Sequence, residues 1–449
     1  MPYESEQGNI VVTLTGDSMI TRGMQAFREK PFLDLVELFR GSDVTVSNLE
    51  MLFHDFEMSW HYKGAASFQV CDPRYLKDLA WMGMDVVTTA TNHAFDYGEE
   101  GFLTTLRHCA EAGLLQAGGG RHLDQSRAPV YLDTRGGRIA VMATTSTFSE
   151  ESRSGPGRAD FRGKAGVSTL RHEVTHHVPA EFLDSLKLAK RELGYEAREQ
   201  SMRRQRGLPP ADAGAPHVQF LGGRFQSGNA FGVTTRCNEE DLESIGRWMR
   251  GAKKQADWLI FAMHCHESGR SEEWYGQTSM EPPDFQIEFA HFTIDNGADA
   301  FVSHGTHYLR GIEVYKGKPI FYSLGNFIFQ NETVQWVPHA AYEGFGLGAG
   351  DTPGDWGWGR SDGGKHGHAG NPVFYRSAVP ECRYEGGALR EIRLHPVDLG
   401  FGRPIGQRGR PLMAEGEVAQ EVLAWLQRVS APYGTEIEIQ GDKGVIRVA

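Results

Sequence analysis

The sequence lacks the features of several common classes of protein. Its 449 residues include only five cysteines, an odd number with no C-x-x-C pair, so we expect reduced and buried thiols rather than a disulfide framework. No apolar run reaches the roughly 18 residues that a membrane span needs, and the first residues have neither the basic nor the apolar region of a signal peptide. We therefore expect a soluble, cytoplasmic protein that does not act with a membrane.

An excess of basic residues is also absent. Lys and Arg number 46 against 58 for Asp and Glu, which gives a net charge of −12. Nucleic-acid binders need a basic surface to displace phosphate counterions, so we expect no nucleic-acid partner. The hydrophobic fraction of 40% and the charged fraction of 23% are typical of globular proteins. The oligomeric state has no signature in this sequence.

What the sequence does contain is a repeated succession of short apolar strand, polar loop and helix. Strands are predicted at 9–15, 44–46, 85–89, 258–263 and 300–302, helices at 75–82, 99–112, 239–254, 285–296 and 415–427, and hairpins at 130–144 and 312–323. This succession predicts an α/β fold with layered sheets.

The chain is predicted to divide into a first domain at 1–335 and an extension at 336–449 that completes the fold. Within the first domain, residues 149–229 are polar, Arg-rich and interrupted by Gly and Pro around one helix-like segment at 180–193, which indicates an insertion. A second irregular stretch, 344–370, is rich in Gly. Both stretches are predicted to be either loops that cover a substrate or simple surface loops.

Polar side chains that can bind metals follow the predicted strands directly. Open α/β sheets bind ligands beyond the carboxyl ends of their strands, so these side chains are expected to converge. They are Asp17, Glu50, Asn92, His93, His264, His304 and His307. Carboxylate, amide and imidazole ligands favour Mn, Fe or Zn over Mg or Ca, and two ions that share a carboxylate would use such a set.

Each residue also has a purely structural interpretation. Asp17 can cap a turn after the first strand, and Glu50 can be a solvated carboxylate. Asn92 can form a turn, and His93 can be a core imidazole. Only their joint occurrence at successive strand ends favours a metal site.

The remaining histidines are open to the same alternatives. His264 and His266 share a face only if their strand continues through Cys265; otherwise one of them packs elsewhere. His304 and His307 suit a tight loop that places two imidazoles near one centre, although a single H-x-x-H is weak evidence for a metal.

Four motifs carry a resemblance to a known family. They are Gly16-Asp17-Ser18-Met19, Ser47-Asn48-Leu49-Glu50, the eight residues 91–98 that begin Thr91-Asn92-His93, and the run 298–327 that contains Ser303-His304-Gly305-Thr306-His307. Over roughly residues 9–330 the chain resembles the CapA family of capsule and poly-γ-glutamate synthesis proteins. That family is similar to the calcineurin-like metallophosphoesterases, so the resemblance implies a catalytic domain with a four-layer α/β/β/α sandwich, inserted loops and a two-metal site.

The resemblance also implies a role for each residue. Asp17 and His307 would hold the first metal, Asn92, His264 and His304 the second, and Glu50 would bridge both. His93 matches the general-acid histidine of the phosphoesterases. Asp96 would either orient a neighbouring group or cap the helix that begins near residue 99.

The sequence departs from the phosphoesterases at the first metal. Met19 stands where those enzymes have a histidine ligand, and Ser47-Asn48-Leu49-Glu50 replaces their second Gly-Asp motif. Phosphate-ester hydrolysis needs both metals to hold the attacking and leaving oxygens. The departure therefore favours a substrate that presents a carboxylate.

A soluble branch of the family resembles peptide-tailoring enzymes, among them an epimerase of lasso-peptide biosynthesis. We expect a metal-dependent isomerase that epimerises the C-terminal Cα of a ribosomal precursor peptide, which it binds through the free carboxylate. His93 is the first acid/base candidate. The unranked candidates for the opposite face are His266, Asp96, His366, His368 and Cys265. The alternatives are a metal-dependent hydrolase of phosphoester or amide bonds, and a non-catalytic accessory protein of capsule or poly-γ-glutamate synthesis.

Overall fold

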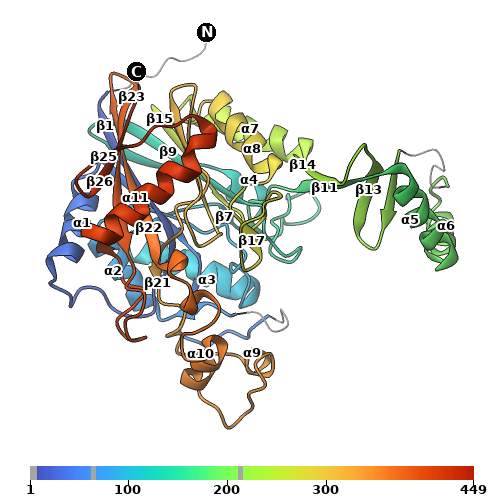
Figure 1. The fold of residues 1–449 in the computed structure, drawn as a ribbon, viewed down its shortest axis with the longest axis horizontal. Coiled ribbons are helices and arrows are strands. Elements are labelled where there is room, and N and C mark those ends of the chain that lie inside the picture. Colours follow the sequence, from blue (N-terminus) through green and yellow to red (C-terminus); the bar gives the residue numbers. More distant parts are fainter. Residues whose placement is uncertain (1–7, 62–66, 211–215, 449) are drawn as a thin grey trace.

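The structure, a computed structural model, describes residues 8–61, 67–210 and 216–448 (Figure 1). Residues 1–7, on which the expectation about the N-terminus rests, lie outside these ranges. The fold is mixed α/β with several sheets, as the succession of strands and helices predicts. In the described ranges, no helix is both long enough and apolar enough to cross a bilayer.

The larger of the two main sheets has ten strands and is centred on the N-terminal strand. Its order is β25 (Glu438–Gln440), β26 (Lys443–Arg447), β23 (Ala388–Asp398), β22 (Arg376–Glu385), β1 (Ile10–Met19), β2 (Val44–Leu49), β5 (Val86–Thr88) and β6 (Leu115–Ala117), with β21 (Asn326–Phe329) on β1 and β24 (Leu412–Met413) on β23. β1, β2, β5 and β6 are parallel, whereas β22 is antiparallel to β1. The late segment of the chain is thus part of the same sheet as the first strand.

The second main sheet has six strands. Its order is β19 (Ile312–Tyr315), β20 (Lys318–Phe321), β18 (Ala300–His304), β15 (Trp258–His264), β9 (Gly137–Thr145) and β8 (Val130–Thr134). Both predicted hairpins, β8–β9 and β19–β20, are antiparallel pairs here and are confirmed. β9, β15 and β18 are parallel, so their carboxyl ends lie at one edge.

The two main sheets pack face to face, and helices cover their other faces. Along β15, Ile260 and Ala262 join a core cluster shared with Val12 and Val46 of the larger sheet, while Phe261 between them faces the opposite way. That opposite face is covered by α7 (Glu239–Ala252) and α8 (Asp284–Asp295). The larger sheet is covered by α1 (Lys30–Arg40) and α2 (Leu76–Met82). Alternation of side chains along the strands therefore builds a core on each face.

Further helices, turns and strand pairs complete the body. The helices are α3 (Gly98–Glu111), α4 (Leu123–Arg127), α9 (His339–Glu343), α10 (Pro353–Ser361) and α11 (Gly416–Ser430), with 3-10 turns η1 (Pro73–Tyr75), η2 (His368–Gly370), η3 (Pro372–Tyr375) and η4 (Ala431–Tyr433). The small strand pairs are β3 (Leu52–Phe53) with β4 (Val70–Cys71), β7 (Gly119–Gly120) with β10 (Gly166–Val167), and β16 (Trp274–Tyr275) with β17 (Thr278–Ser279).

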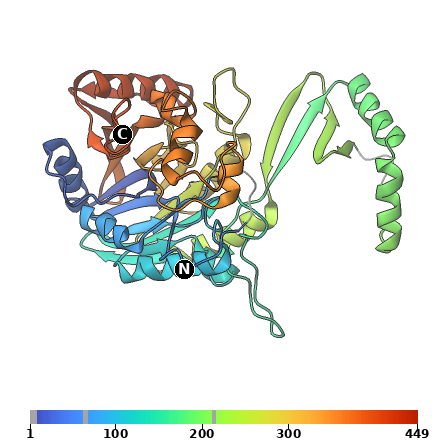
Figure 2. The ribbon, with the colours of Figure 1, turned by 90° about the horizontal axis from the view of Figure 1, so that it is seen from below.

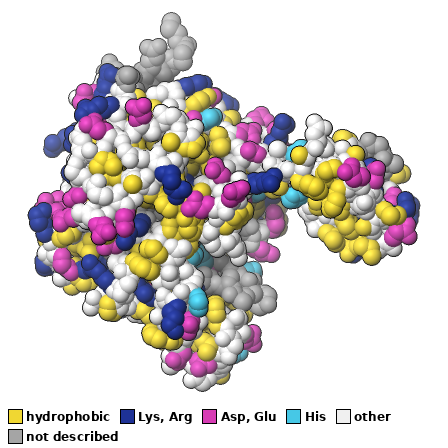
Figure 3. All heavy atoms as spheres, in the orientation of Figure 1, with side chains coloured by type: hydrophobic (Ala, Val, Ile, Leu, Met, Phe, Trp, Pro, Cys, Tyr) yellow, Lys and Arg dark blue, Asp and Glu magenta, His cyan; other side chains and the backbone are white. Residues whose placement is uncertain are grey.

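Residues 172–237 contain a lobe that projects from the body (Figures 1 and 2), which we call the projecting lobe. Its four strands are ordered β12 (His217–Phe220), β13 (Gly223–Ser227), β11 (His172–Val178) and β14 (Gly232–Cys237), beside α5 (Ala180–Glu192) and α6 (Tyr195–Gln205). The sequence predicts one helix here and no sheet, because these strands are polar and weakly patterned. Hydrophobic side chains gather on the lobe surface (Figure 3), among them Leu193, Leu221 and Phe231, which are 66%, 71% and 57% exposed.

Two further elements differ from prediction. The stretch 344–370 is not wholly irregular, because α10 forms there behind a capping box of Thr352 and Asp355. β1 does not stop at residue 15 but continues to Met19 through a bulge between Leu14 and Asp17. At Gly16 a Cβ atom would lie 2.0 Å from the Gly325 carbonyl oxygen, so the two backbones touch there.

Candidate metal centre

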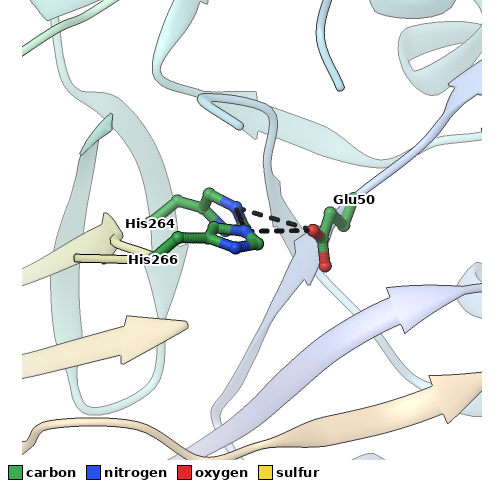
Figure 4. A group of neighbouring side chains, drawn as sticks. All are labelled: Glu50, His264 and His266. Atoms are coloured by element: carbon green, nitrogen blue, oxygen red, sulfur yellow. Dashed lines mark hydrogen bonds and ion pairs between the residues drawn. The ribbon is translucent and has the colours of Figure 1, made fainter. Parts of the chain in front are cut away.

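The carboxyl ends of strands from the two main sheets bring acidic and imidazole side chains together. Two groups could each hold a metal ion: a first cluster of Asp17, Glu50 and His307, and a second cluster of Glu50, His264 and His266. Within each cluster the candidate ligand atoms lie within 4.8 Å of one another. Figure 4 shows the Glu50 carboxylate facing the rings of His264 and His266. Glu50 belongs to both clusters.

The Asp17 carboxylate in β1 is held from two sides. Its Oδ1 accepts a hydrogen bond from Asn48 Nδ2 at 2.7 Å, and its Oδ2 accepts one from the Gly305 backbone N–H at 3.0 Å. His307 Nδ1 lies 3.5 Å from Asp17 Oδ2 and 3.6 Å from Glu50 Oε2. Asp17 therefore does not cap a turn, because it is a buried strand residue whose carboxylate faces the cluster.

His307 occupies an unusual backbone conformation. Its φ is 66°, in the left-handed region that is costly for a residue with a side chain and that recurs at functional sites. Asn326 at the start of β21 donates to the His307 carbonyl at 3.0 Å, and its Oδ1 lies 3.0 Å from His307 Nδ1. The neighbouring strand thus fixes this imidazole.

The second cluster converges on one imidazole nitrogen. His264 Nε2 lies 3.1 Å from Asn92 Oδ1, 3.0 Å from His266 Nε2 and 3.6 Å from Glu50 Oε1. A neutral imidazole carries one proton, so it cannot donate to all three neighbours. A cation among these atoms would satisfy them together, and the donor set of carboxylate, amide oxygen and imidazole suits a first-row metal.

His266, predicted as an acid/base candidate, is itself a member of the second cluster. Its Nε2 lies 3.6 Å from Glu50 Oε1, and its backbone N–H donates to Thr147 Oγ1 at 2.8 Å. The Cys265 thiol between the two histidines is directed away, with Sγ 3.3 Å from Glu267 Oε2. β15 ends at His264, so the strand does not continue through Cys265, yet both imidazoles face Glu50, which makes His266 a candidate ligand.

His304 lies beside the clusters rather than in them. Its Nε2 is 3.2 Å from the Thr15 carbonyl oxygen. Its Nδ1 is enclosed and has no hydrogen-bond partner within the described ranges. An unsatisfied buried nitrogen is costly, and a bound cation is one way to satisfy it. The part of His304 in holding the second metal stays a prediction.

The charges of Asp17 and His264 suit a cation, whereas the pKa of His307 is raised because Glu50 and Asp17 outweigh the opposing effect of burial. Burial alone would raise the pKa of Asp17, but the hydrogen bond to His307 and the charge of that ring lower it overall, so the carboxylate is ionised. Burial and the neighbouring His266 hold the pKa of His264 well below its usual value. Ionised carboxylate and neutral imidazole are the forms that bind metals.

His93 and Asp96 form a pair next to the second cluster. His93 Nδ1 lies 2.8 Å from Asp96 Oδ2, which also accepts the Gln69 backbone N–H at 2.8 Å. The interpretation of Asp96 as a helix cap is wrong, because α3 begins at Gly98 after Tyr97 with no side-chain cap. Asp96 instead orients His93, whose chain neighbour Asn92 contacts His264.

His368 and His366, two of the unranked acid/base candidates, differ in their distance from the clusters. The His368 ring lies 5.2 Å from the His307 ring, and burial together with the charge of His307 lowers the pKa of His368 well below its usual value. His366 is exposed, with Nε2 3.7 Å from Asp362 Oδ2. Within the described residues, only the first of these histidines adjoins a cluster.

Sequence reasoning did not single out Asn48. Besides Asp17, its Nδ2 approaches His264 Nδ1 at 3.3 Å, while its Oδ1 accepts the Thr88 hydroxyl at 2.7 Å. Asn48 thus contacts a member of each cluster. Its position two residues before Glu50 was the available signal, because alternate strand residues share a face.

A wide cavity adjoins the second cluster. It has a volume of 1320 Å³ and extends along the base of the projecting lobe, with Thr147, Glu267, Arg171 and Arg236 in its lining. Since Thr147 accepts the His266 N–H, this cavity borders the more exposed side of the centre.

Comparison with known proteins places these residues in a wider group. The family described as bacterial capsule synthesis protein PGA_cap matches residues 11–331. Two uncharacterized proteins of Sinorhizobium fredii are each 33% identical over 446 residues, which covers 96% of this chain and 92% of each relative. The PGA biosynthesis protein CapA of Bacillus subtilis is 26% identical over 71% of this chain and 62% of its own length. Both clusters fall within the matched region.

Proposed function

Because the chain belongs to the PGA_cap family of bacterial capsule synthesis proteins, we propose that it is a metal-dependent accessory protein in the synthesis of a poly-γ-glutamate-like polymer. Its centre would bind carboxylates of the glutamyl chain. The observation that supports this most directly is the convergence of Asp17, Glu50, His264 and His307 from separate strand ends. The name of the Bacillus subtilis relative supports the polymer.

The proposal includes two divalent ions, with Mn, Fe or Zn preferred because of the imidazole ligands. Asp17 and His307 would hold one ion, His264, His266 and Asn92 the other, and Glu50 would bridge them. A divalent ion bound here supplies positive charge to a substrate carboxylate. Asn48 and Asn326 would keep the ligands in place by the hydrogen bonds described above. We further propose that the packing of helices on the two facing sheets is a four-layer α/β/β/α sandwich.

A second candidate function is favoured by the His93–Asp96 pair. In a peptide Cα epimerase, as in the lasso-peptide branch of the family, His93 would exchange the Cα proton of a C-terminal residue at Nε2. Asp96 would hold the proton on Nδ1 and stabilise the charged ring. His368 is the candidate for the opposite face, because its ring adjoins His307. The peptide carboxylate would then lie at the same centre.

Metal analysis and ligand binding test the first candidate. The purified protein is expected to hold two ions per chain and to bind γ-linked glutamate oligomers more tightly than their carboxamide analogues, with binding lost after chelation. Asp17→Asn should lose at least one ion and weaken oligomer binding, whereas Asp133→Asn, at a carboxylate that is 84% exposed on β8, should match the wild type. Oligomer binding that is unchanged after complete metal removal would contradict the proposal.

Isotope exchange tests the second candidate. In deuterated water, an epimerase would introduce deuterium at the Cα of the C-terminal residue of a peptide, in a metal-dependent manner and without cleavage. Asp96→Asn should slow this exchange while metal content stays unchanged, because Asp96 contacts His93 and is a member of neither cluster. A cleaved product would instead indicate a hydrolase, and the absence of both products would leave the accessory role.

A further inference from the structure

A small cavity lies next to the first cluster, on the side of α10, which Figure 1 shows at the foot of the molecule. Its volume is 260 Å³, and Asn331, Glu332, Arg360 and His368 are among the residues that line it. The His368 ring, which lines the cavity, is 5.2 Å from the ring of His307 in the first cluster. This size suits one amino-acid side chain rather than a long segment.

Arg360 brings to this cavity a positive charge that forms no ion pair within 4.0 Å among the described residues, although Glu332 acts on it from a greater distance. Its guanidinium lies over the Trp356 ring at 5.2 Å, which fixes its direction. The Nη1 atom is fully enclosed and has no hydrogen-bond partner in the described part of the chain. Burial lowers the pKa of Arg360, but a guanidinium remains protonated in proteins.

The nearby carboxylate is already engaged by another arginine. Arg408 Nε donates to Glu332 Oε2 at 2.5 Å and Arg408 Nη2 donates to Glu332 Oε1, while the Tyr375 hydroxyl donates to Oε2 at 3.2 Å. Glu332 in the cavity lining is thus already paired with Arg408 and does not hydrogen-bond Arg360. Arg360 is half-buried, and its enclosed Nη1 lacks a hydrogen-bond acceptor in the described residues, so a carboxylate that enters the cavity would satisfy this atom.

We propose that this cavity is a second carboxylate site, in which Arg360 pairs with one carboxylate of a glutamyl chain while another carboxylate of that chain lies at the metal centre. The inference rests on the proposed function and deepens it, because it assigns the substrate at least two carboxylates. A planar guanidinium matches a carboxylate through two parallel hydrogen bonds. Arg360 is then a specificity residue that separates polyanionic chains from singly charged peptides.

The test compares two ligands on four proteins by calorimetry with Mn²⁺ present. One ligand is γ-linked triglutamate. The other is an analogue that keeps only the C-terminal γ-carboxylate and carries a carboxamide in place of each α-carboxylate. The proteins are the wild type, Arg360→Gln, Arg360→Lys, and the control Arg390→Gln, which alters an exposed arginine on β23. Metal content is measured for each protein, and we expect it to be unchanged because Arg360 is in neither cluster.

The wild type and the Arg390→Gln control should prefer triglutamate by about tenfold or more, the value of one charged hydrogen-bond pair. Arg360→Gln should abolish this preference, and Arg360→Lys should retain part of it, since lysine keeps the charge but loses the planar fork. A preference that survives in Arg360→Gln would overturn the second carboxylate site. So would a wild type that binds both ligands equally or neither.

A chelated sample separates the two proposals. If chelation abolishes triglutamate binding but Arg360→Gln has no effect, the metal-dependent function stands and the Arg360 site is wrong. If the Arg360-dependent preference persists unchanged without metal, the carboxylate site stands and the proposed role of the metal centre is wrong.

Discussion

The two clusters share Glu50 but differ in how firmly their other members are held. In the first cluster, the Asp17 side chain is fully buried and accepts two hydrogen bonds, while Asn326 holds His307 in a strained backbone conformation. In the second cluster, the His266 side chain is 26% exposed and its Nε2 faces another imidazole. Rigid second contacts raise metal affinity, and open positions admit substrate. The first cluster is therefore suited to retain an ion, and the second to exchange ligands.

Removal of the shared carboxylate should eliminate this difference altogether. We expect Glu50→Gln to lose both ions, because the neutral amide removes the one charge that both clusters use. Metal content after dialysis, measured by mass spectrometry, checks this. The control is Glu385→Gln, at an exposed carboxylate at the end of β22. Retention of one full ion by Glu50→Gln would show that Glu50 does not bridge the clusters.

Single histidine substitutions should make the difference measurable. We expect His307→Gln to lose about one ion per chain, whereas His266→Gln should weaken the second ion about tenfold while leaving the first in place. The reason is that His266 is more exposed, while His264, in contact with Asn92, remains in the second cluster. Competition with a chromogenic chelator resolves the two affinities, with His366→Gln as the exposed control. The comparison fails if His266→Gln proves the more damaging of the two.

Asn48 connects the clusters, so its loss should affect both to a lesser degree. Asn48→Ala removes the donor to Asp17 and the neighbour of His264, and we expect affinity for each ion to fall about 10- to 100-fold. Thr88→Val deletes only the hydroxyl that donates to Asn48, so it should also lower the affinity for each ion, but by less than Asn48→Ala does. Equal metal affinities in the wild type, Asn48→Ala and Thr88→Val would mean that Asn48 does not position the ligands.

The smallest effect is expected outside both clusters, at a buried pair in the larger sheet. Burial alone would raise the pKa of Glu381, but the hydrogen bond to His395 and the charge of Arg383 lower it below 4.5. Its stabilising contribution is thus present above about pH 4.5 and is lost as pH falls through the lower pKa of the folded state. In chelated samples, Glu381→Gln should therefore reduce the dependence of melting temperature on pH in this acidic range. An unchanged acid profile would assign acid unfolding to other groups.

The sequence was most informative where apolar strands end abruptly. Such ends identified Asp17, Glu50 and His264, and the structure brings their side chains together, because parallel strands present their carboxyl ends at one edge. The relative positions of His266 and His304 could not be predicted in this way. Which imidazole belongs to a cluster depends on how the two main sheets pack against each other. Tertiary packing of this kind cannot be read from a single strand.

Segments without strong periodicity were the least predictable. The strands of the projecting lobe are largely polar, with consecutive histidines at His176 and His177 of β11, and the lobe buries only a small cluster around Val178 and Leu183. These strands pair through backbone hydrogen bonds between segments, and no local sequence pattern predicts that pairing. The bulge that carries β1 through Gly16 to Asp17 was missed for the same reason, since nothing in the neighbouring residues marks it.

The contact at Gly16 also sets an order of events during biosynthesis. The Asp17 backbone N–H donates to the Gly325 carbonyl at 2.9 Å, and the next residue in the chain, Asn326, positions His307. During translation, Asp17 and Glu50 are synthesised long before residues 325 and 326. Until those later residues leave the ribosome, the backbone contact at Gly16 and the hydrogen bonds to His307 cannot form. The first cluster can therefore be completed only after residue 326 has been synthesised, because Asp17 and Glu50 alone lack the positioned imidazole of His307.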